Sequence, residues 1–207
     1  MIIIVGKYII GIDEVGRGPL AGPMMVGAVA IAGDTGFLEG IRDSKKLSEK
    51  KRNEWSEKIW MEKEKRNRLE SGRLLAGIKI AIVAVAPENI DRYGISQTIK
   101  GAVAKCLTTL KIAPDECEIM LDGSLYAPKE YKNQQTIIKG DEKFPVISAA
   151  SVVAKVYRDA QMVKLNEKYP EYGFDVHKGY GTAAHIAAIK KHGLSAIHRR
   201  IFCRNFV

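Results

Sequence analysis

Apolar residues along the chain form either short continuous runs, typical of strands, or spaced positions, typical of helices. The runs Lys7–Asp13 and Met24–Ala32 are separated by the turn-rich segment Glu14–Pro23 and predict two strands joined by a wide loop. Three further strands are predicted at Ile78–Ala86, Glu118–Leu121 and Gln135–Lys139. Five strands are therefore expected.

Four segments have the spacing of helices. They run from Ser48 to about Leu69, from Ser96 to the break at Pro114, from about Ser148 to Tyr169, and from Thr182 to His192. Strands and helices thus mix along the chain, which predicts an α/β fold: a mixed five-stranded sheet flanked by helices, with a helical region at the C-terminal end. Because no repeat or linker interrupts residues 1–207, we expect a single domain whose helical C-terminal part begins at about residue 182.

Composition narrows the class of protein. With 207 residues, of which 46% are hydrophobic, the chain is long and apolar enough to fold around a core without disulfides. The longest apolar run, Met24–Ala32, is far short of the ~20 residues of a membrane helix, and Met1–Val5 is too short for a signal peptide. The three cysteines form no CxxC pair, which fits a reducing compartment. We expect a soluble cytoplasmic protein that does not bind membranes and is a monomer.

The charge points to a kind of partner. The formal net charge is +9, and the excess of Lys and Arg is concentrated in residues 42–73 and 155–207. An excess of this kind is typical of proteins that bind a polyanion. Outside the two basic segments, isolated carboxylates stand among apolar residues, and these are candidates for chemistry.

Four carboxylates stand out by position. Asp13 and Asp122 each end a predicted strand, and if these strands are parallel neighbours their side chains emerge at the same sheet edge. Glu14 follows Asp13 directly, and Asp159 lies beside the apolar stripe of the third helix. Such acids repel one another unless cations lie between them, and oxygen ligands without His or Cys favour Mg²⁺ or Mn²⁺. Two such ions can hydrolyse a phosphodiester.

Each acid also has an ordinary structural interpretation. Asp159 can pair with Lys155 one turn earlier, and its position alone favours that interpretation. Asp122-Gly123 can be a turn, and Asp13-Glu14 can be loop residues. Asp141 also follows a predicted strand, which shows how common the pattern is, and Asp43 can simply precede a helix.

Two glycine-flanked side chains are candidates for binding a substrate. Gly16-Arg17-Gly18 follows the first acids, and such glycines let backbone groups approach a ribose 2′-OH while Arg17 reaches a phosphate. Tyr180 lies between two glycines and can stack on a sugar or a base, or it can cover the core.

Taken together, several separated segments resemble type 2 ribonucleases H, specifically bacterial-type ribonuclease HII. The matching segments are Gly11–Pro23 (GIDEVGRGPLAGP), Asp43–Ser48 (DSKKLS), Leu121–Ser124 (LDGS), Lys139–Asp141 (KGD), Ser148–Asp159 (SAASVVAKVYRD), Tyr172–Thr182 (YGFDVHKGYGT) with His185, and His198–Phe202 (HRRIF). They span nearly the whole chain in order, and the combination is highly specific.

The resemblance implies a ribonuclease H fold and a two-metal endonuclease that cuts the RNA strand of RNA–DNA hybrids, leaving 5′-phosphate and 3′-OH ends. It assigns the metal-binding and catalytic acids to Asp13, Glu14, Asp122 and Asp159, against the position-based interpretation of Asp159. It assigns the recognition of a ribonucleotide followed by DNA to Gly16, Arg17, Gly18 and Tyr180. The enzyme is therefore also expected to nick at single ribonucleotides embedded in duplex DNA.

The resemblance also extends to the segment before the first helix. Ser44, Lys45 and Lys46 are similar to family residues near the substrate backbone, with a solvated helix approach as the alternative. The related ribonuclease HIII group has GKG in place of GRG and an added N-terminal domain; this chain has GRG, and we expect no such domain in it. The histidines have no HxxxH spacing, so we expect structural or substrate-edge roles rather than a zinc site.

Two other functions remain as alternatives. The first is a DNA nuclease with the same acidic chemistry, such as a Holliday-junction resolvase, for which a reader of the 2′-OH has no use. The second is a non-catalytic hybrid-binding protein, which does not need all four acids.

Overall fold

A five-stranded mixed sheet forms the centre of the molecule. The computed structural model describes residues 8–68 and 77–206, and its strands lie in the order β3-β2-β1-β4-β5. Strands β1 and β3 run antiparallel to β2, whereas β4 runs parallel to both of its neighbours, β1 and β5. The predicted mixed sheet is confirmed. Its strands are β1 Tyr8–Val15, β2 Met24–Ala32, β3 Ile78–Val85, β4 Cys117–Asp122 and β5 Gln134–Ile137.

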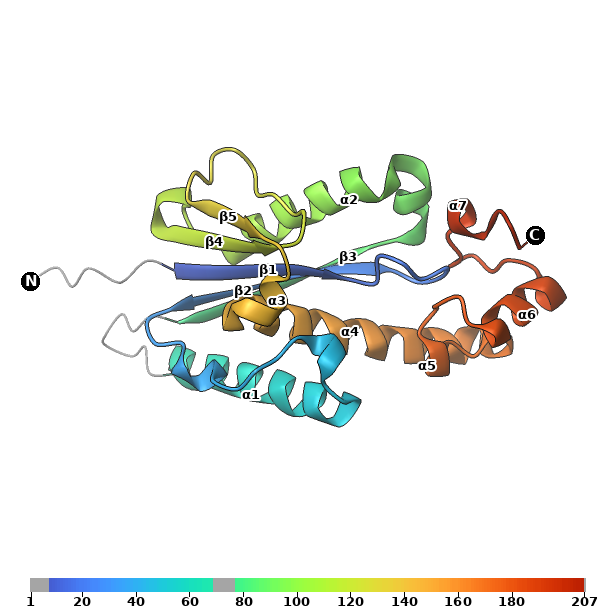
Figure 1. The fold of residues 1–207 in the computed structure, drawn as a ribbon, viewed down its shortest axis with the longest axis horizontal. Coiled ribbons are helices and arrows are strands. Elements are labelled where there is room, and N and C mark those ends of the chain that lie inside the picture. The colour runs from blue at the N-terminus through green and yellow to red at the C-terminus, as the bar shows by residue number, and fades with distance from the viewer. Residues whose placement is uncertain (1–7, 69–76, 207) are drawn as a thin grey trace, which may run out of the picture.

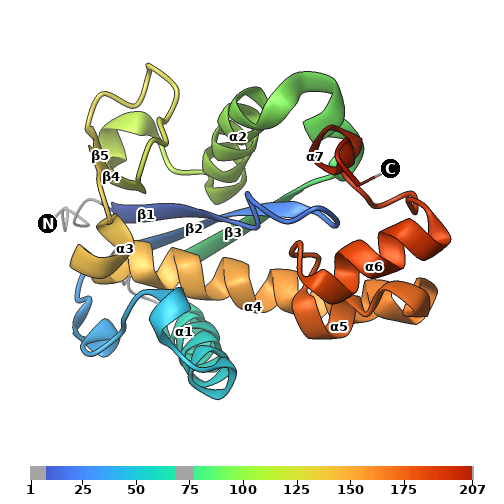
Figure 2. The same ribbon diagram turned by 45° about the vertical axis from the view of Figure 1, so that its right-hand side comes forward.

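Long helices cover both faces of this sheet (Figures 1 and 2). Helix α2 (Pro87–Leu110) packs on one face through Val103 and Leu107, while α4 (Pro145–Lys168) packs on the other with α1 (Glu49–Arg68) beyond it. Each interface buries a separate apolar cluster. In the part of the chain that the structure describes, no helix is long and apolar enough to cross a membrane.

Short helices lie at two places outside these layers. Helix α3 (Gly140–Lys143) follows β5 directly. The C-terminal helices group at one end of the sheet, at the right in Figure 1. They form the helical C-terminal region that the sequence predicted. They are α5 Phe174–His177, α6 Ala183–His192 and α7 Arg200–Cys203. Single 3-10 turns occur at Gly36–Leu38, Ser44–Lys46, Pro114–Glu116 and Pro170–Tyr172.

Several helix boundaries differ from the prediction. The second helix begins at Pro87 rather than at Ser96, because Pro87 occupies the first turn, where a missing N–H costs little. A break at Gly94 (φ 76°, ψ 161°) separates its two parts, and the apolar spacing revealed only the second part. Helix α4 likewise starts at Pro145. The cap at Ser48 is confirmed, since its Oγ accepts from Lys51 N at 3.3 Å, while the predicted end at Leu69 lies outside the described residues.

Two glycines bring α4 into direct contact with the sheet. A Cβ at Gly11 would lie 2.2 Å from the Val146 carbonyl oxygen, and one at Gly27 would lie 2.6 Å from the Ala150 carbonyl oxygen. Only glycine permits backbone to approach this closely. The approach places the start of α4, and α3 before it, beside the strand that carries Asp13.

Candidate active site

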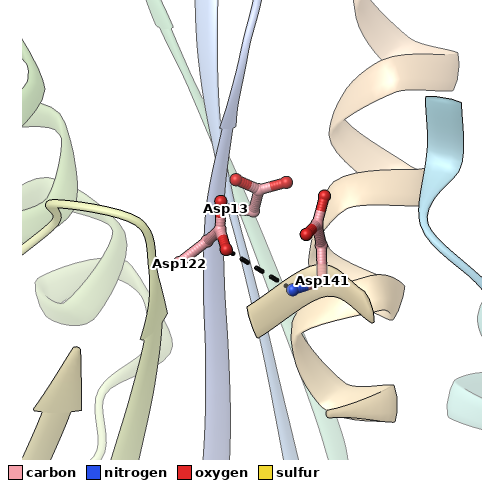
Figure 3. Close-up of side chains that lie close together, drawn as sticks. All are labelled: Asp13, Asp122 and Asp141. Carbon is pink, nitrogen blue, oxygen red and sulfur yellow. Dashed lines mark hydrogen bonds between the residues drawn. The ribbon is translucent and has the colours of Figure 1, made fainter. Parts of the chain in front are cut away.

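Three carboxylates converge at the carboxyl edge of the sheet. In the parallel pair β1–β4, Ile12 lies opposite Leu121, so Asp13 and Asp122 follow at neighbouring positions. Asp141, in α3, completes the group, and one carboxylate oxygen from each acid lies within 4.8 Å of the others. Figure 3 shows the three side chains directed toward one another. The two strands are parallel neighbours, which is the condition on which their acids were predicted to converge.

Backbone donors hold one of the three acids in place. Asp122 Oδ1 accepts from the N–H groups of Gly140 at 2.6 Å and Asp141 at 3.4 Å. These donors belong to the start of α3, so the short helix both supplies one acid and orients another. A side chain at residue 140 would not fit, because its Cβ would lie 2.6 Å from Ile147 Cδ1.

Burial makes the charge of this cluster costly. Asp13 is only 2% exposed, and burial raises its pKa well above the usual range, although a hydrogen bond with Ser151 opposes the rise. The neighbouring charges of Glu14, Asp122 and Asp141 raise the pKa of Asp13 further. The site therefore carries more negative charge than its protein surroundings neutralise, which is the electrostatic condition for holding cations.

Glu14 lies beside the cluster with one unpaired oxygen. Its Oε1 is 3.4 Å from Arg17 Nη1, whereas its Oε2 is buried without a hydrogen-bond partner in the structure. Burial raises the pKa of Glu14, and the charge of Arg17 opposes that shift. A buried carboxylate oxygen with no donor is costly, and a bound cation would satisfy it.

The structure does not bring Asp159 into this cluster. Its Oδ1 accepts from Lys155 Nζ at 2.8 Å, and its Oδ2 lies 4.0 Å from Arg52 Nη2. The pairing with Lys155 that residue spacing favoured is thus the one observed. Asp141 occupies the place in the cluster that the family resemblance assigned to Asp159, although its position after a strand did not distinguish it from an ordinary strand-end acid.

The segment Ser44–Lys46 approaches the same acids from the other side. Ser44 is buried and shares a 2.8 Å hydrogen bond with Ser151, so it supports the site from within rather than from its surface. Lys45 Nζ lies 3.3 Å from Asp141 Oδ2. Burial raises the pKa of Asp141, and Lys45 limits this rise. Lys46 pairs with Glu142 at 2.7 Å and lies one step further out.

Two buried arginines fix the glycine loop. Arg199 donates to the carbonyl oxygens of Gly16 at 2.7 Å, Arg17 at 2.9 Å and Gly22 at 2.9 Å. Arg158 lies under the same loop, and a Cβ at Gly16 (φ 84°) would be 2.1 Å from its Nε. Glycine at this position is therefore required by both backbone conformation and space.

Arg158 also holds the loop that carries Tyr180. Its Nη2 donates to the Lys178 carbonyl at 3.0 Å, and its guanidinium lies 5.8 Å from the centre of the Tyr180 ring. The Gly179 carbonyl accepts from Leu20 N at 2.8 Å, which ties this loop to the glycine loop. Tyr180 remains 43% exposed. The two predicted substrate-binding loops are thus fixed to one another by buried hydrogen bonds.

The histidines form a directional hydrogen-bond chain rather than a metal site. Ser195 N donates to His198 Nδ1 at 2.9 Å, which leaves the His198 proton on Nε2. That Nε2 donates to His185 Nε2 at 3.1 Å, and His185 Nδ1 then donates to the Tyr180 carbonyl at 2.9 Å. Across residues 8–68 and 77–206, the only group of acids, His and Cys that fits a metal ion is the aspartate cluster.

Comparison with known proteins decides the family. The model of the family described as Ribonuclease HII matches residues 10–205. The chain belongs to the ribonuclease HII family. A member from Coxiella burnetii is 42% identical over 195 residues, covering 94% of this chain and 87% of that relative. A member from Bacillus cereus is 44% identical over 196 residues, covering 94% of this chain and 68% of that relative.

Solved structures agree with this assignment. The ribonuclease H2 of Pyrococcus horikoshii OT3 superposes with a TM-score of 0.71 at 26% identity, covering 96% of each chain. The ribonuclease HII of Archaeoglobus fulgidus, solved in complex with PCNA, gives 0.69 at 26% identity and covers 93% of each chain. The ribonuclease H-like fold and the endonuclease class expected for a ribonuclease HII are confirmed.

Three contributors to the site escaped sequence reasoning. The Lys139–Asp141 segment was matched to the family, but the role of Asp141 depends on α3 folding back onto the end of β4. Arg158 and Arg199 lie in two other matched segments, SAASVVAKVYRD and HRRIF, yet their contacts join residues far apart in the chain. The motifs contained these residues without indicating what they do.

Proposed function

We propose that this chain hydrolyses the RNA strand of RNA–DNA hybrids and nicks duplex DNA on the 5′ side of single embedded ribonucleotides. The observation that supports this most is the pairing of two features at one sheet edge: a buried acidic cluster, and two fixed loops that carry Arg17 and Tyr180. The cluster provides phosphodiester chemistry, and the loops provide recognition of the sugar.

The four acids Asp13, Glu14, Asp122 and Asp141 are proposed to hold two divalent cations, Mg²⁺ or Mn²⁺. The fit rests on the close carboxylate oxygens, the unpaired Glu14 Oε2 and the absence of histidine and cysteine from the cluster within the described residues. A bound pair of such ions supplies an activated water and stabilises the charge that develops on the leaving 3′ oxygen.

The protein's own residues position the substrate. Arg17 has a half-exposed side chain beside Glu14 and is placed to contact a phosphate near the cut. The glycine loop has open space at Gly18, where no atom lies within 4 Å of a Cβ position, so a sugar edge can approach its backbone. The exposed ring of Tyr180 offers a stacking surface for the next sugar. Lys45, beside Asp141, adds a cation at the opposite side of the acids.

These features also weigh against the two alternatives. A DNA-only nuclease has no use for backbone groups prepared to contact a 2′-OH. A protein that only binds hybrids gains nothing from four buried or half-buried carboxylates, which repel a polyanion. The acids therefore favour hydrolysis, and the loops favour ribonucleotides.

A duplex DNA carrying one ribonucleotide tests the proposal. We expect wild-type protein with Mg²⁺ or Mn²⁺ to cut 5′ to the ribonucleotide and to leave an all-DNA duplex intact. Tyr180→Ala should lower kcat/KM for this substrate by roughly tenfold or more, because a stacked sugar or base is lost. Its effect on long hybrids should be smaller. Cutting of hybrids with no cutting of the embedded ribonucleotide would refute the proposed role of the two loops.

Asp122→Asn is the matched control for chemistry. Cleavage should be lost, because this side chain of the cluster no longer carries charge. Hybrid binding should be retained, because the substitution removes a negative charge from a site that faces a polyanion. Near-normal turnover by this variant would contradict the proposed catalytic site.

A further inference from the structure

A groove next to the acids is not used by the function proposed so far. One cavity of about 330 Å³ lies between the second part of α2, the segment after β4 and the glycine loop. Its lining residues are Arg17, Ser96, Ile99, Lys100, Ser124, Leu125 and Tyr126. A second cavity of about 590 Å³ shares Lys100 and Tyr126 with it and extends to Lys129 and Gln134. Lys100 and Tyr126 line both cavities, which are therefore neighbours and are here together named the Tyr126 groove.

The groove starts at the reaction centre. Ser124 is two residues beyond Asp122, and Arg17 pairs with Glu14 at 3.4 Å. A strand whose phosphate lies at the acids therefore needs to continue only a short distance to enter the groove. No other described cavity has this connection through both residues.

The charge of the groove suits a nucleic-acid backbone. Its lining includes Arg17, Lys100 and Lys129 and no Asp or Glu. The break at Gly94 adds to the positive charge of the groove. A new helical segment starts beside Ser96, and the N–H groups of its first turn give that end a positive partial charge. Three cations and a helix end along one groove favour successive phosphates.

Tyr126 provides a different kind of contact. Its side chain is 63% exposed and lines both cavities, so the ring is available for contact with a ligand in the groove. An exposed ring that lines the same cavity as two lysines suits a base or sugar that stacks while neighbouring phosphates meet cations.

The wall that carries Tyr126 is already fixed. Gln134 Oε1 accepts from Ala127 N at 2.8 Å, and its Nε2 donates to the carbonyls of Ala127 and Tyr131. Thr136 Oγ1 donates to the Leu125 carbonyl at 2.6 Å. These bonds hold the segment from both sides, so binding would not have to order it.

We propose that the Tyr126 groove binds the cut strand where it leaves the active site, with Lys100 and Lys129 on its phosphates and Tyr126 stacked on a sugar or base. This inference rests on the proposed function and adds a second binding region to it. Arg17 then lies between the two regions, at the junction of the acids and the groove.

The first test measures binding to a duplex with one embedded ribonucleotide, in an Asp122→Asn background that does not cleave. The double change Lys100→Ala and Lys129→Ala should raise Kd about tenfold and lower the slope of log Kd against log salt by roughly 1.8, or about 0.9 for each phosphate contact. Tyr126→Ala should raise Kd by a similar factor with little change in slope. Lys105→Ala, on the same helix but outside the lining, is the control and should change neither.

Shortened substrates identify the strand. The cut strand is shortened first on one side of the ribonucleotide and then, in a second substrate, on the other side. For one of these two substrates, the tenfold effect of the double change on Kd should fall to within about twofold. The proposal would be overturned if the effect on Kd persisted with both shortened substrates, or if it disappeared only when the opposite strand was shortened. It would also be overturned if Lys105→Ala reproduced the effect. No effect on the full duplex would overturn it as well.

A separate measurement keeps this inference distinct from the proposed function. On long RNA–DNA hybrid, the double variant in the otherwise wild-type protein should raise KM about tenfold and leave kcat within about twofold. If the wild type fails to cut hybrid, the proposed function is wrong. If the wild type cuts and the double variant matches it, only the groove is wrong.

Discussion

At the scale of single residues, Asp141 and Asp159 show how similar acids acquire different roles. Both are nearly buried, and each has a lysine within 3.3 Å. Asp141 faces two more carboxylates, whereas Asp159 faces Lys155 and Arg52. The surroundings of Asp141 leave negative charge for a cation to neutralise, and those of Asp159 do not.

This contrast predicts opposite results for two equivalent substitutions. Asp141→Asn should reduce cleavage by more than the roughly 10–100-fold typical of losing a residue outside the first coordination shell. Asp159→Asn should keep cleavage within about tenfold and instead lower the melting temperature, since Lys155 loses its buried partner. Rates and melting curves of both variants decide the matter. A folded Asp159→Asn variant as inactive as Asp141→Asn would show that Asp159 does act in the reaction.

Asp13 leads to a prediction about stability. Its carboxylate is buried beside other acids, so the native state is destabilised by repulsion and desolvation when no cation is bound. Asp13→Asn should therefore raise the stability of EDTA-treated protein by about 1–2 kcal/mol, or roughly 3–6 °C in Tm. With excess Mg²⁺ the advantage should vanish, because the wild type then gains binding energy. A lower Tm for the metal-free variant would argue against this account.

At the scale of elements, buried cations and histidines join segments that the sheet does not hold. Arg199 and Arg158 bond only to backbone carbonyls, and these belong to the glycine loop and the Tyr180 loop. The chain from His198 through His185 ends on the Tyr180 carbonyl. Both loops are therefore held by α4, through Arg158, and by the C-terminal segment, through Arg199 and His185.

The histidine chain makes stability depend on pH. Burial, and then the neighbouring His185, lower the pKa of His198 from 6.5 to about 4. Between pH 6.5 and 4 the unfolded protein binds this proton and the folded protein does not, so stability falls as the pH falls through that window. From pH 7 to pH 5 the loss due to His198 is about 2 kcal/mol.

The measurement is the free energy of unfolding at pH 7 and pH 5 for the wild type and His198→Gln. The variant should be less stable at pH 7 but lose about 2 kcal/mol less on acidification. Equal losses in both proteins would mean that His198 accepts its proton in the folded state as easily as in the unfolded one.

At the scale of the whole molecule, the net charge of +9 and the acidic centre have separate tasks. A net positive charge favours binding of any polyanion, because contacts with phosphates carry no sequence information. In the proposed function, the acids act only on the phosphate that the loops place against them. Affinity and chemistry should therefore respond differently to salt.

Raising salt from 50 to 200 mM should weaken binding of hybrid and of plain DNA duplex alike, by roughly tenfold or more, as counterion release requires. The value of kcat at saturating hybrid should change by less than about twofold. Binding is measured with Asp122→Asn and turnover with the wild type. A kcat that falls in parallel with affinity would mean that the charged surface takes part in the chemical step.

Local sequence determined the elements and most of the candidate residues. Short apolar runs predicted the five strands, and helical spacing predicted the long helices. The parallel pairing of β1 and β4, which the convergence of Asp13 and Asp122 required, is present. The apolar pattern of each element lies within one short stretch of chain, so the sequence displays it directly. The order of the motifs along the chain indicated the family.

Only the tertiary structure decided which acids share one charge environment. Residue spacing favoured the Lys155–Asp159 pair, whereas the family resemblance assigned Asp159 to the metal site. Packing of α3 against the end of β4 brought Asp141 into the acidic cluster. The buried arginines and the Tyr126 groove likewise join residues far apart in the chain. The reason is physical: desolvation and Coulomb interactions depend on distance in space, and sequence separation does not fix that distance.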